Sequence, residues 1–190
     1  MKKFVLGLMI SAGLLGATTV VANADTTGSS TGDVTFTGGT LSMSVDATHL
    51  AFGSNTISSS DATLATSSTP TVTVSDLRGT SAGWTLTVAQ GQQFNTALNG
   101  TGSSLINAAL TVAGTESDSA VTNGSTTLTP GTTSAAGAAG TVASAKNGTG
   151  NGASTVTFSD SKLAVPWKTT KLATGYTTTL TWNLNDTPGN

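Results

Sequence analysis

The sequence predicts an all-β protein, a single antiparallel β-sandwich or barrel-like domain with long Gly/Ser/Thr-rich loops. The first observation is composition, because 40 Thr and 23 Ser supply 63 of the 190 residues and Gly supplies 23 more. Threonine favours strands, whereas serine and glycine favour turns. The second is that apolar residues alternate with polar ones along most of the chain, the period of a strand with one buried face. The third is that Asn-Gly pairs, which favour tight reversals, lie between these stretches.

The first 24 residues predict a signal peptide that is cleaved after Ala24. Lys2-Lys3 is a basic start, an apolar stretch follows from Phe4 to Ala17, and Ala22-Asn23-Ala24 is a small-x-small cleavage triplet. The apolar stretch is short for a membrane span, which needs about 20 residues. We therefore expect an exported, extracellular protein whose mature part has no membrane span.

Charge and cysteine content exclude several classes of function. The chain has 7 Lys+Arg against 9 Asp+Glu, a formal charge of -2, and no cysteine. Nucleic-acid binding is not expected, because no cluster of cations is available to neutralise a run of phosphates. The absence of cysteine removes disulfides, thiolate metal sites and cysteine nucleophiles together. The sequence predicts neither a metal nor a cofactor.

The mature chain is expected to consist of a short N-terminal arm followed by one domain. Residues 25–32 are polar and rich in Gly, Ser and Thr, which predicts a flexible N-terminal arm, and residues 33–190 form the domain. Strands with one buried face are predicted at Val34 and Phe36, Leu41 to Val45, Val72 to Val74, Gly83 to Val88, Leu110 to Val112, Val156 to Phe158 and Tyr176 to Leu184.

The stretches between these strands are predicted to be loops and turns. They are rich in Gly, Asn, Ser and Thr, and they cover Gly53 to Pro70, Asn99 to Gly102, Asn123-Gly124 and Thr129 to Ala153. The only helical structure expected is a short turn around Gln92 to Leu98.

Two of the predicted strands contain tryptophan, which occurs three times in the chain. In the first, Trp84, Leu86 and Val88 share one face because alternate residues of a strand point the same way. The second strand repeats this pattern near the C-terminus, with one apolar face made by Tyr176, Leu180, Trp182 and Leu184. Both strands therefore carry a Trp-x-Leu motif on a half-buried face.

These motifs resemble those of the WxL-domain surface proteins of low-GC Gram-positive bacteria. The C-terminal segment is similar to the distal motif of that family at Tyr176, Leu180, Thr181, Trp182, Leu184 and Pro188. Trp84 and Leu86 fit the proximal motif, and the resemblance covers the chain from about Asp33 onward. The short length makes the chain similar to the small members of the family.

The resemblance implies a binding protein and not an enzyme. Members of the family attach non-covalently to the cell wall, through peptidoglycan or another wall polymer. The sequence leaves the role of surface display open among adhesion, matrix binding and stress tolerance. The resemblance also implies a protein partner, a membrane-anchored WxL-interacting protein with which the chain joins a surface complex. The residues expected to carry wall or partner binding are those that match the two motifs.

The residues themselves leave the role of the tryptophans open. Each indole lies on the apolar face of its strand, where burial contributes about 1.5–3 kcal/mol or more to a thin core. Alternatively, a partly exposed indole stacks on a sugar or on a partner. The opposite face of the C-terminal strand is either an ordinary solvated face or a ladder of glycan-binding groups, and it carries Thr177, Thr179, Thr181 and Asn183. Trp167 fits a surface position and a core position equally.

Catalysis is weakly supported. His49 is the only histidine, and no catalytic signature surrounds any serine. Glu116 and Asp118 are candidates for a glycan hydrolase, but a solvated loop explains them better. Asn147, Asn151 and Asp160 offer oxygens for calcium without the dense pattern of a calcium loop. The alternative to wall binding is a structural or adhesive subunit that assembles by β-strand docking, with itself or with the membrane-anchored partner.

Overall fold

The structure is a computed structural model, and it describes residues 27–46 and 49–189. The predicted signal peptide and its cleavage site after Ala24 lie outside the described residues. The chain divides into one unit that ends at Thr35 and a second unit, Phe36–Asn190. The strands found among the described residues all lie in the second unit.

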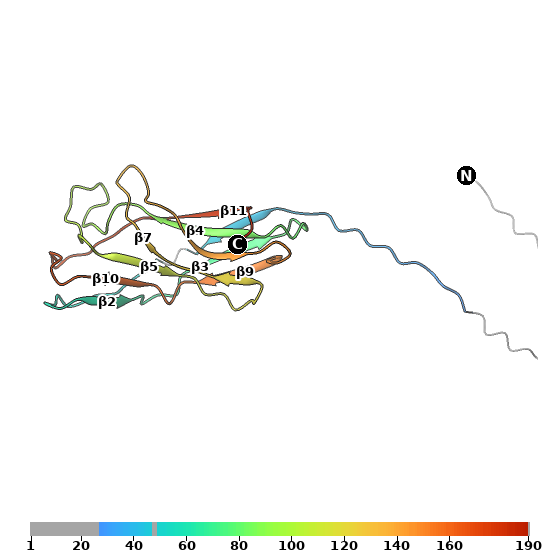
Figure 1. Ribbon diagram of the computed structural model, residues 1–190, viewed down its shortest axis with the longest axis horizontal. Helices are drawn as coiled ribbons and strands as arrows, with labels where there is room; N and C mark the ends of the chain where they lie inside the picture. The colour runs from blue at the N-terminus through green and yellow to red at the C-terminus, as the bar shows by residue number, and fades with distance from the viewer. Residues whose placement is uncertain (1–26, 47–48, 190) are drawn as a thin grey trace, which may run out of the picture. The chain divides into compact units, whose positions relative to one another are not determined.

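The described part of the second unit is built from strands alone, which confirms the predicted all-β class (Figure 1). The strands are β1 (Leu41–Val45), β2 (Ala62–Ala65), β3 (Thr71–Asp76), β4 (Trp84–Gln90), β5 (Ala109–Ala113), β6 (Val121–Asn123), β7 (Ser125–Leu128), β8 (Gly140–Ala145), β9 (Gly152–Thr157), β10 (Lys162–Val165) and β11 (Leu180–Asn185). Within the described residues, no helix is long and apolar enough to cross a membrane.

The strands form three antiparallel sheets. Sheet A has the order β1-β3-β9, sheet B the order β2-β10-β5-β7, and sheet C the order β11-β4-β8-β6. In Figure 1, β4 and β11 lie in one layer, and β3, β5, β9 and β10 lie in the other. Phe158, directly after β9, packs its ring 4.7 Å from that of Trp182 on β11, measured between ring centroids. Side chains from all three sheets form one buried core, so the domain is sandwich-like.

The period-two pattern predicted most of these strands correctly. In β3, for example, Val72 and Val74 are buried while the threonines between them are partly exposed. The same holds in β5 and β9, where Leu110, Val112 and Val156 are buried and the residues next to them are partly or fully exposed. A side chain on each second residue therefore faces the core, as the alternation requires.

Two expected loops contain strands. The stretch Gly53 to Pro70 includes β2, and Thr129 to Ala153 includes β8 and the start of β9. Their sequences consist mostly of Ala, Gly, Ser and Thr, which give a weak hydrophobic signal. Ala143 and Ala145 are nonetheless fully buried, because β8 lies beside the large side chains of β4 and only small residues fit there.

Two other expectations were wrong. No helical turn forms around Gln92 to Leu98, because Asn95 exchanges backbone hydrogen bonds with Thr177, at 2.9 Å in each direction. No strand forms at Val34 and Phe36 either. Residues 27–40 have no regular secondary structure, and the two side chains are 76% and 88% exposed.

Candidate functional site

The fold brings the two Trp-x-Leu motifs together. β4 and β11 are antiparallel neighbours in sheet C, and the register pairs Val88 with Trp182 and Leu86 with Leu184. The motifs, about 100 residues apart in sequence, therefore form one continuous two-strand unit. One face of this unit points into the sandwich and the other points outward.

Trp84 belongs to the core and offers no contact surface. Its side chain is 0% exposed, and its indole Nε1–H donates a hydrogen bond to the carbonyl oxygen of Gly150 at 3.1 Å. Gly150 has a φ of +76°, and a Cβ there would collide with Ala145 and lie 2.7 Å from the indole nitrogen. The proximal tryptophan thus fixes the loop between β8 and β9, and Leu86 is buried beside it.

The distal motif is more accessible. Trp182 and Leu180 are half-buried and lie on the inner face of β11, and Tyr176 is half-buried just before that strand. The Tyr176 hydroxyl accepts a hydrogen bond from the backbone N–H of Leu172 at 2.8 Å. Leu184, also half-buried, borders a separate shallow hollow with Leu41 and Met43. The half-buried members of the distal motif therefore all lie beside open space.

Thr181 and Pro188 have exposed side chains and do not face the core. Thr181 belongs to a polar outer surface of the β4–β11 pair. This surface, called here the threonine face, consists of Thr85, Thr87, Thr179, Thr181 and Asn183, all partly or fully exposed. Thr87 Oγ1 donates to the Asn183 carbonyl at 3.3 Å, and Thr85 Oγ1 donates to the Thr187 carbonyl at 2.9 Å. The predicted row of hydroxyls therefore exists, except that Thr177 lines the groove described next.

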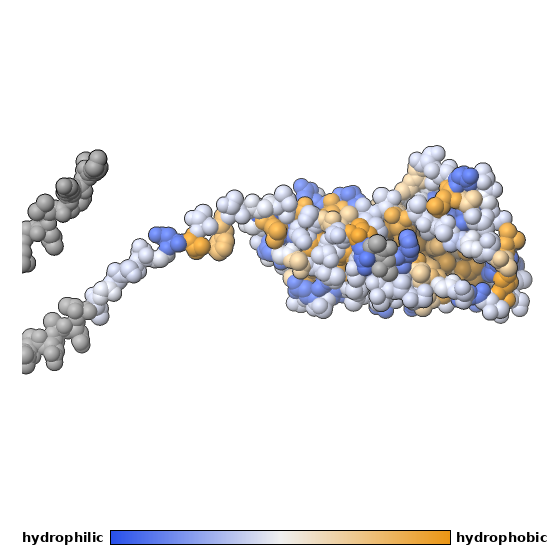
Figure 2. All heavy atoms as spheres, turned by 180° about the vertical axis from the view of Figure 1, so that it is seen from behind, coloured by the Kyte–Doolittle hydropathy of each residue, from blue (hydrophilic) through white to orange (hydrophobic). Residues whose placement is uncertain are grey.

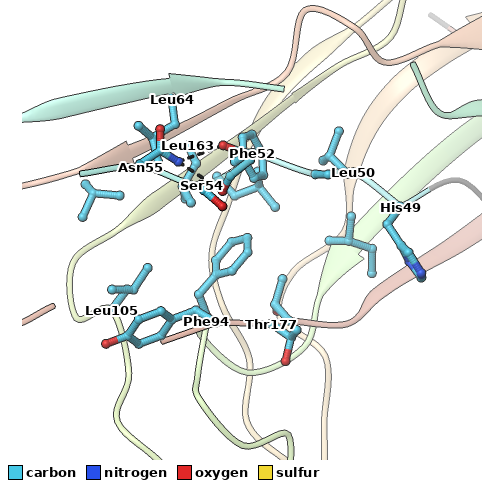
Figure 3. Close-up of a pocket in the computed structure, with 18 of the residues that line it drawn as sticks. His49, Leu50, Phe52, Ser54, Asn55, Leu64, Phe94, Leu105, Leu163 and Thr177 are labelled. Carbon is cyan, nitrogen blue, oxygen red and sulfur yellow. Dashed lines mark hydrogen bonds between the residues drawn. The ribbon is translucent and has the colours of Figure 1, made fainter. Parts of the chain in front are cut away.

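An apolar groove of about 1340 Å³ opens between sheet B and the inner face of β11. Figure 2 shows apolar side chains gathered in a hollow with more polar residues around it. Its apolar lining includes Leu50, Phe52, Leu64, Phe94, Leu105, Leu110, Phe158, Leu163, Val165, Tyr176, Leu180 and Trp182. Phe52 and Phe94 approach each other edge to face across it, with ring centroids 6.2 Å apart (Figure 3). The groove suits apolar side chains better than a hydroxyl-rich sugar.

Most of this lining comes from residues that carry no sequence pattern of their own. Phe52 and Leu50 belong to the segment before β2, and Phe94 and Leu105 belong to the irregular segment between β4 and β5. Neither segment has strand periodicity, so the pattern that located the motifs gives no signal here. Phe158 was predicted to be buried, but not to contact Trp182.

A buried ion pair supports the turn before Trp84. Asp76 is 2% exposed and binds Arg78 through two bonds, Nη2 to Oδ2 at 2.7 Å and Nε to Oδ1 at 2.9 Å. Arg78 Nη2 also donates to the carbonyl oxygen of Gly83 at 2.7 Å. The side-chain hydrogen bond from Arg78 holds the pKa of Asp76 below its ordinary value, although burial opposes the shift. The pair anchors the entry to β4 and is structural.

The carboxylates considered for catalysis are engaged in local turns. Glu116 Oε1 accepts from the Asp118 N–H at 3.2 Å, and Asp118 Oδ1 accepts from the Ala120 N–H at 2.9 Å. His49 is exposed at the rim of the groove. Asn151 Nδ2 donates to Ser81 Oγ at 3.0 Å, and Asp160 accepts from Thr115. Over the described ranges, no group of three or more His, Asp or Glu side chains is placed to hold a metal ion.

Trp167 is a surface residue. Its side chain is 53% exposed, and the Lys168 ammonium lies 5.3 Å from its ring centroid. Its backbone N–H donates to Asp61 at 2.8 Å, which ties the end of β10 to the start of β2. Of the two positions that the sequence left open for Trp167, the structure supports the surface one.

Comparison with known families gives a match over nearly the whole chain. A family model described as WxL domain surface cell wall-binding matches residues 18–188, which include both Trp-x-Leu motifs. Neither the curated proteins nor the solved structures contain a match to the chain.

Proposed function

The chain belongs to the WxL family of surface cell wall-binding domains, and we propose on this basis that it attaches non-covalently to peptidoglycan as an exported, non-catalytic protein. The observation that carries this proposal is the pairing of β4 with β11, which joins the two family motifs in one sheet. On export the signal peptide is removed after Ala24. At the surface the protein joins a complex with a membrane-anchored partner.

The threonine face is the part of the β4–β11 pair that we assign to the wall. Peptidoglycan glycan strands present hydroxyl and acetamido groups, which exchange hydrogen bonds with threonine hydroxyls and asparagine amides. Thr181 and Asn183 are exposed and two residues apart on β11, so their side chains point the same way, about 7 Å apart. Thr85 and Thr87 widen this row onto β4.

The tryptophans support this surface from beneath. Trp84 is buried and Trp182 packs on Phe158, so both hold β4 and β11 in place from the inner side. Loss of binding after a change at Trp84 would therefore report misfolding and not a lost contact. The decisive variants must lie on the outer face.

A pelleting assay with purified peptidoglycan tests the proposal. The double variant Thr181→Val and Asn183→Val removes polar groups from the outer face and keeps side chains that favour strands. The matched control, Thr127→Val and Thr155→Val, makes exposed threonine changes in sheets B and A. We expect the wild type and the control to pellet and the outer-face variant to stay in solution. Equal pelleting of all three would reject this face as the binding surface.

A second role, docking with another protein through a β-strand, is favoured by a different observation. The apolar groove exposes Leu180 and Trp182 of the edge strand β11, and such a surface is typical of a site that binds a protein partner. Wall binding and strand docking use opposite faces of β11, so one molecule accommodates both.

A further inference from the structure

Two features of the described chain complement each other in their pattern of apolar residues. The first is the apolar groove, which lies between β11, the edge strand of sheet C, and β2, the edge strand of sheet B. The second is the segment Asp33–Thr37, which alternates apolar and polar residues as a strand does but pairs with no sheet. Its two apolar side chains, Val34 and Phe36, are among the most exposed large hydrophobic residues of the described chain.

We propose that the groove of one molecule binds the segment Asp33–Thr37 of a second copy as an added strand along the free edge of β11. Among the described strands, β11 has β4 on one side and no strand on the other. A strand added to that free edge gains main-chain hydrogen bonds and places alternate side chains between the layers. The inserted side chains are Val34 and Phe36.

The pattern of the segment matches the pattern of β11. Along β11, Leu180 and Trp182 face inward while Thr181 and Asn183 face outward. An added strand with Val34 and Phe36 inward has Thr35 and Thr37 outward. The inner face of the sheet then stays apolar, and its outer face stays polar. A register shift of one residue would place threonines in the apolar groove, so the alternation also sets the register.

A charged residue of the groove lining is opposite in sign to the charged residue of the segment. Asp33 is the only charged residue in the described part of the chain before Gly39. Lys171 lines the groove, where its Nζ donates to the carbonyl oxygens of Pro166, Trp167 and Thr169 at 3.2 Å each. A carboxylate beside this ammonium is favourable, and its contribution falls as salt screens the pair.

The length of chain between Phe36 and Gly39 is too short for Phe36 to reach the groove of its own chain. Phe36 lies three residues before Gly39, a reach of about 10 Å at most. Val45 at the near rim of the groove lies six residues after Gly39 along extended chain, about 20 Å away. A return would also need a reversal at Gly38-Gly39, and neither glycine has the positive φ of a tight hairpin turn.

Backbone hydrogen bonds hold Gly39 and Thr40 beside Leu77. The Gly39 N–H donates to the Leu77 carbonyl at 2.7 Å, and the Leu77 N–H donates to Thr40 at 3.1 Å, so the chain continues the line of β1. A segment that leaves from one end of β1 and a groove beyond the other end form a head-to-tail contact. Such a contact does not close on itself in a dimer, so it predicts open chains of molecules.

Sedimentation velocity of the exported chain over a range of concentrations tests this proposal. We expect the average mass of the wild type to rise beyond that of a dimer. Val34→Asp with Phe36→Asp should weaken self-association about ten-fold or more, because two charges would enter an apolar groove. Thr35→Asp with Thr37→Asp is the matched control, since it adds the same charge on the outward face and should retain self-association.

A labelled peptide of residues 31–39 identifies the site directly. Its fluorescence polarisation should rise on addition of the Val34→Asp/Phe36→Asp protein, whose groove is intact, and a peptide with both aspartates should not bind. A monomeric wild type that excludes the peptide, while the variant binds it, would overturn the proposal by showing that the chain occupies its own groove. A monomeric wild type without peptide binding to either protein would overturn it as well.

This inference does not depend on wall binding. The Val34→Asp/Phe36→Asp variant should pellet with peptidoglycan as the wild type does, because the threonine face is unchanged. If this variant no longer self-associates but still pellets, the result supports binding of the segment in the groove. If the Thr181→Val/Asn183→Val variant no longer pellets but still self-associates, the result concerns wall binding alone. An equal loss of both activities in the arm variant would contradict the separation of the two sites.

Discussion

Leu86 of β4 and Leu184 of β11 are directly opposed in the antiparallel register, so the leucines of the two Trp-x-Leu motifs form a cross-strand pair. Leu86 is fully buried, and Leu184 is half-buried at the edge of the sheet. The recurrence of the motif thus has a structural explanation: each copy supplies one half of the same two-strand unit.

This pairing predicts unequal but coupled effects of truncation. Leu86→Ala should lower the free energy of unfolding by about 2–5 kcal/mol, because it leaves a cavity in a closed core. Leu184→Ala should cost about 1–2 kcal/mol, because the site is open on one side. A double-mutant cycle by urea denaturation should give a coupling of about 0.5–1 kcal/mol. Simple additivity would contradict the cross-strand contact.

Gly150 is predicted to accept no side chain. Gly150→Ala forces a Cβ against Ala145 and the Trp84 indole at a positive φ, and it should cost about 2 kcal/mol or more. Gly148→Ala is the matched control, since Gly148 also has a positive φ but nothing within 4 Å of its Cβ position. Chemical denaturation of both proteins measures the difference. Equal losses would indicate that backbone strain alone matters and that the contact with Trp84 does not.

Trp84 and Trp182 should respond differently to the same change. Trp84→Phe removes the hydrogen bond to Gly150 and part of a buried ring, and it should cost about 1–3 kcal/mol. Trp182→Phe retains an aromatic ring against Phe158 and should cost less. Thermal unfolding compares the two variants. A larger loss for Trp182→Phe would contradict the assignment of Trp84 to the core.

The Asp76–Arg78 pair predicts loss of stability in acid. Because the folded pKa of Asp76 is lowered, the pair contributes fully above the unfolded pKa of about 4, and the contribution disappears as the pH falls through the lower folded pKa. Urea denaturation between pH 6 and pH 2, a range of about four units that brackets this change, should show a steep fall for the wild type. The Asp76→Asn variant should have a lower free energy of unfolding than the wild type at neutral pH, and this free energy should fall less as the pH is lowered. If the stability of Asp76→Asn depended on pH in the same way as that of the wild type, the role of the pair would be contradicted.

The sequence predicted those strands whose side chains differ strongly between faces. β3, β4, β5 and β11 alternate Val, Leu or Trp with Thr or Asn over most of their length, and the structure forms all four. β8 was missed because Ala143 and Ala145 carry little hydrophobic signal, although they are fully buried. Burial there follows from the neighbouring strand and not from the residues themselves, which local pattern analysis does not include.

Val34 and Phe36 illustrate the opposite error. Their alternation favours a strand, but a strand also needs a partner edge, and among the described residues neither side chain pairs with one. The groove was equally unpredictable, because irregular segments bring Phe52 and Phe94 together across it. The motif residues and the outward face of Thr181 were predicted from sequence, whereas the pairing of the two motifs and the full burial of Trp84 required the structure.

The most direct test of the central claim is an NMR titration of the isotope-labelled exported chain with soluble glycan fragments of peptidoglycan. If the wall binds the threonine face, backbone amides around Thr181 and Asn183 on β11, and around Thr85 and Thr87 on β4, shift or broaden together as fragments are added. Amides in the apolar groove, such as those of Phe52 and Phe94, should not change. A spectrum that stays constant, or changes confined to the groove, would contradict wall binding through the threonine face.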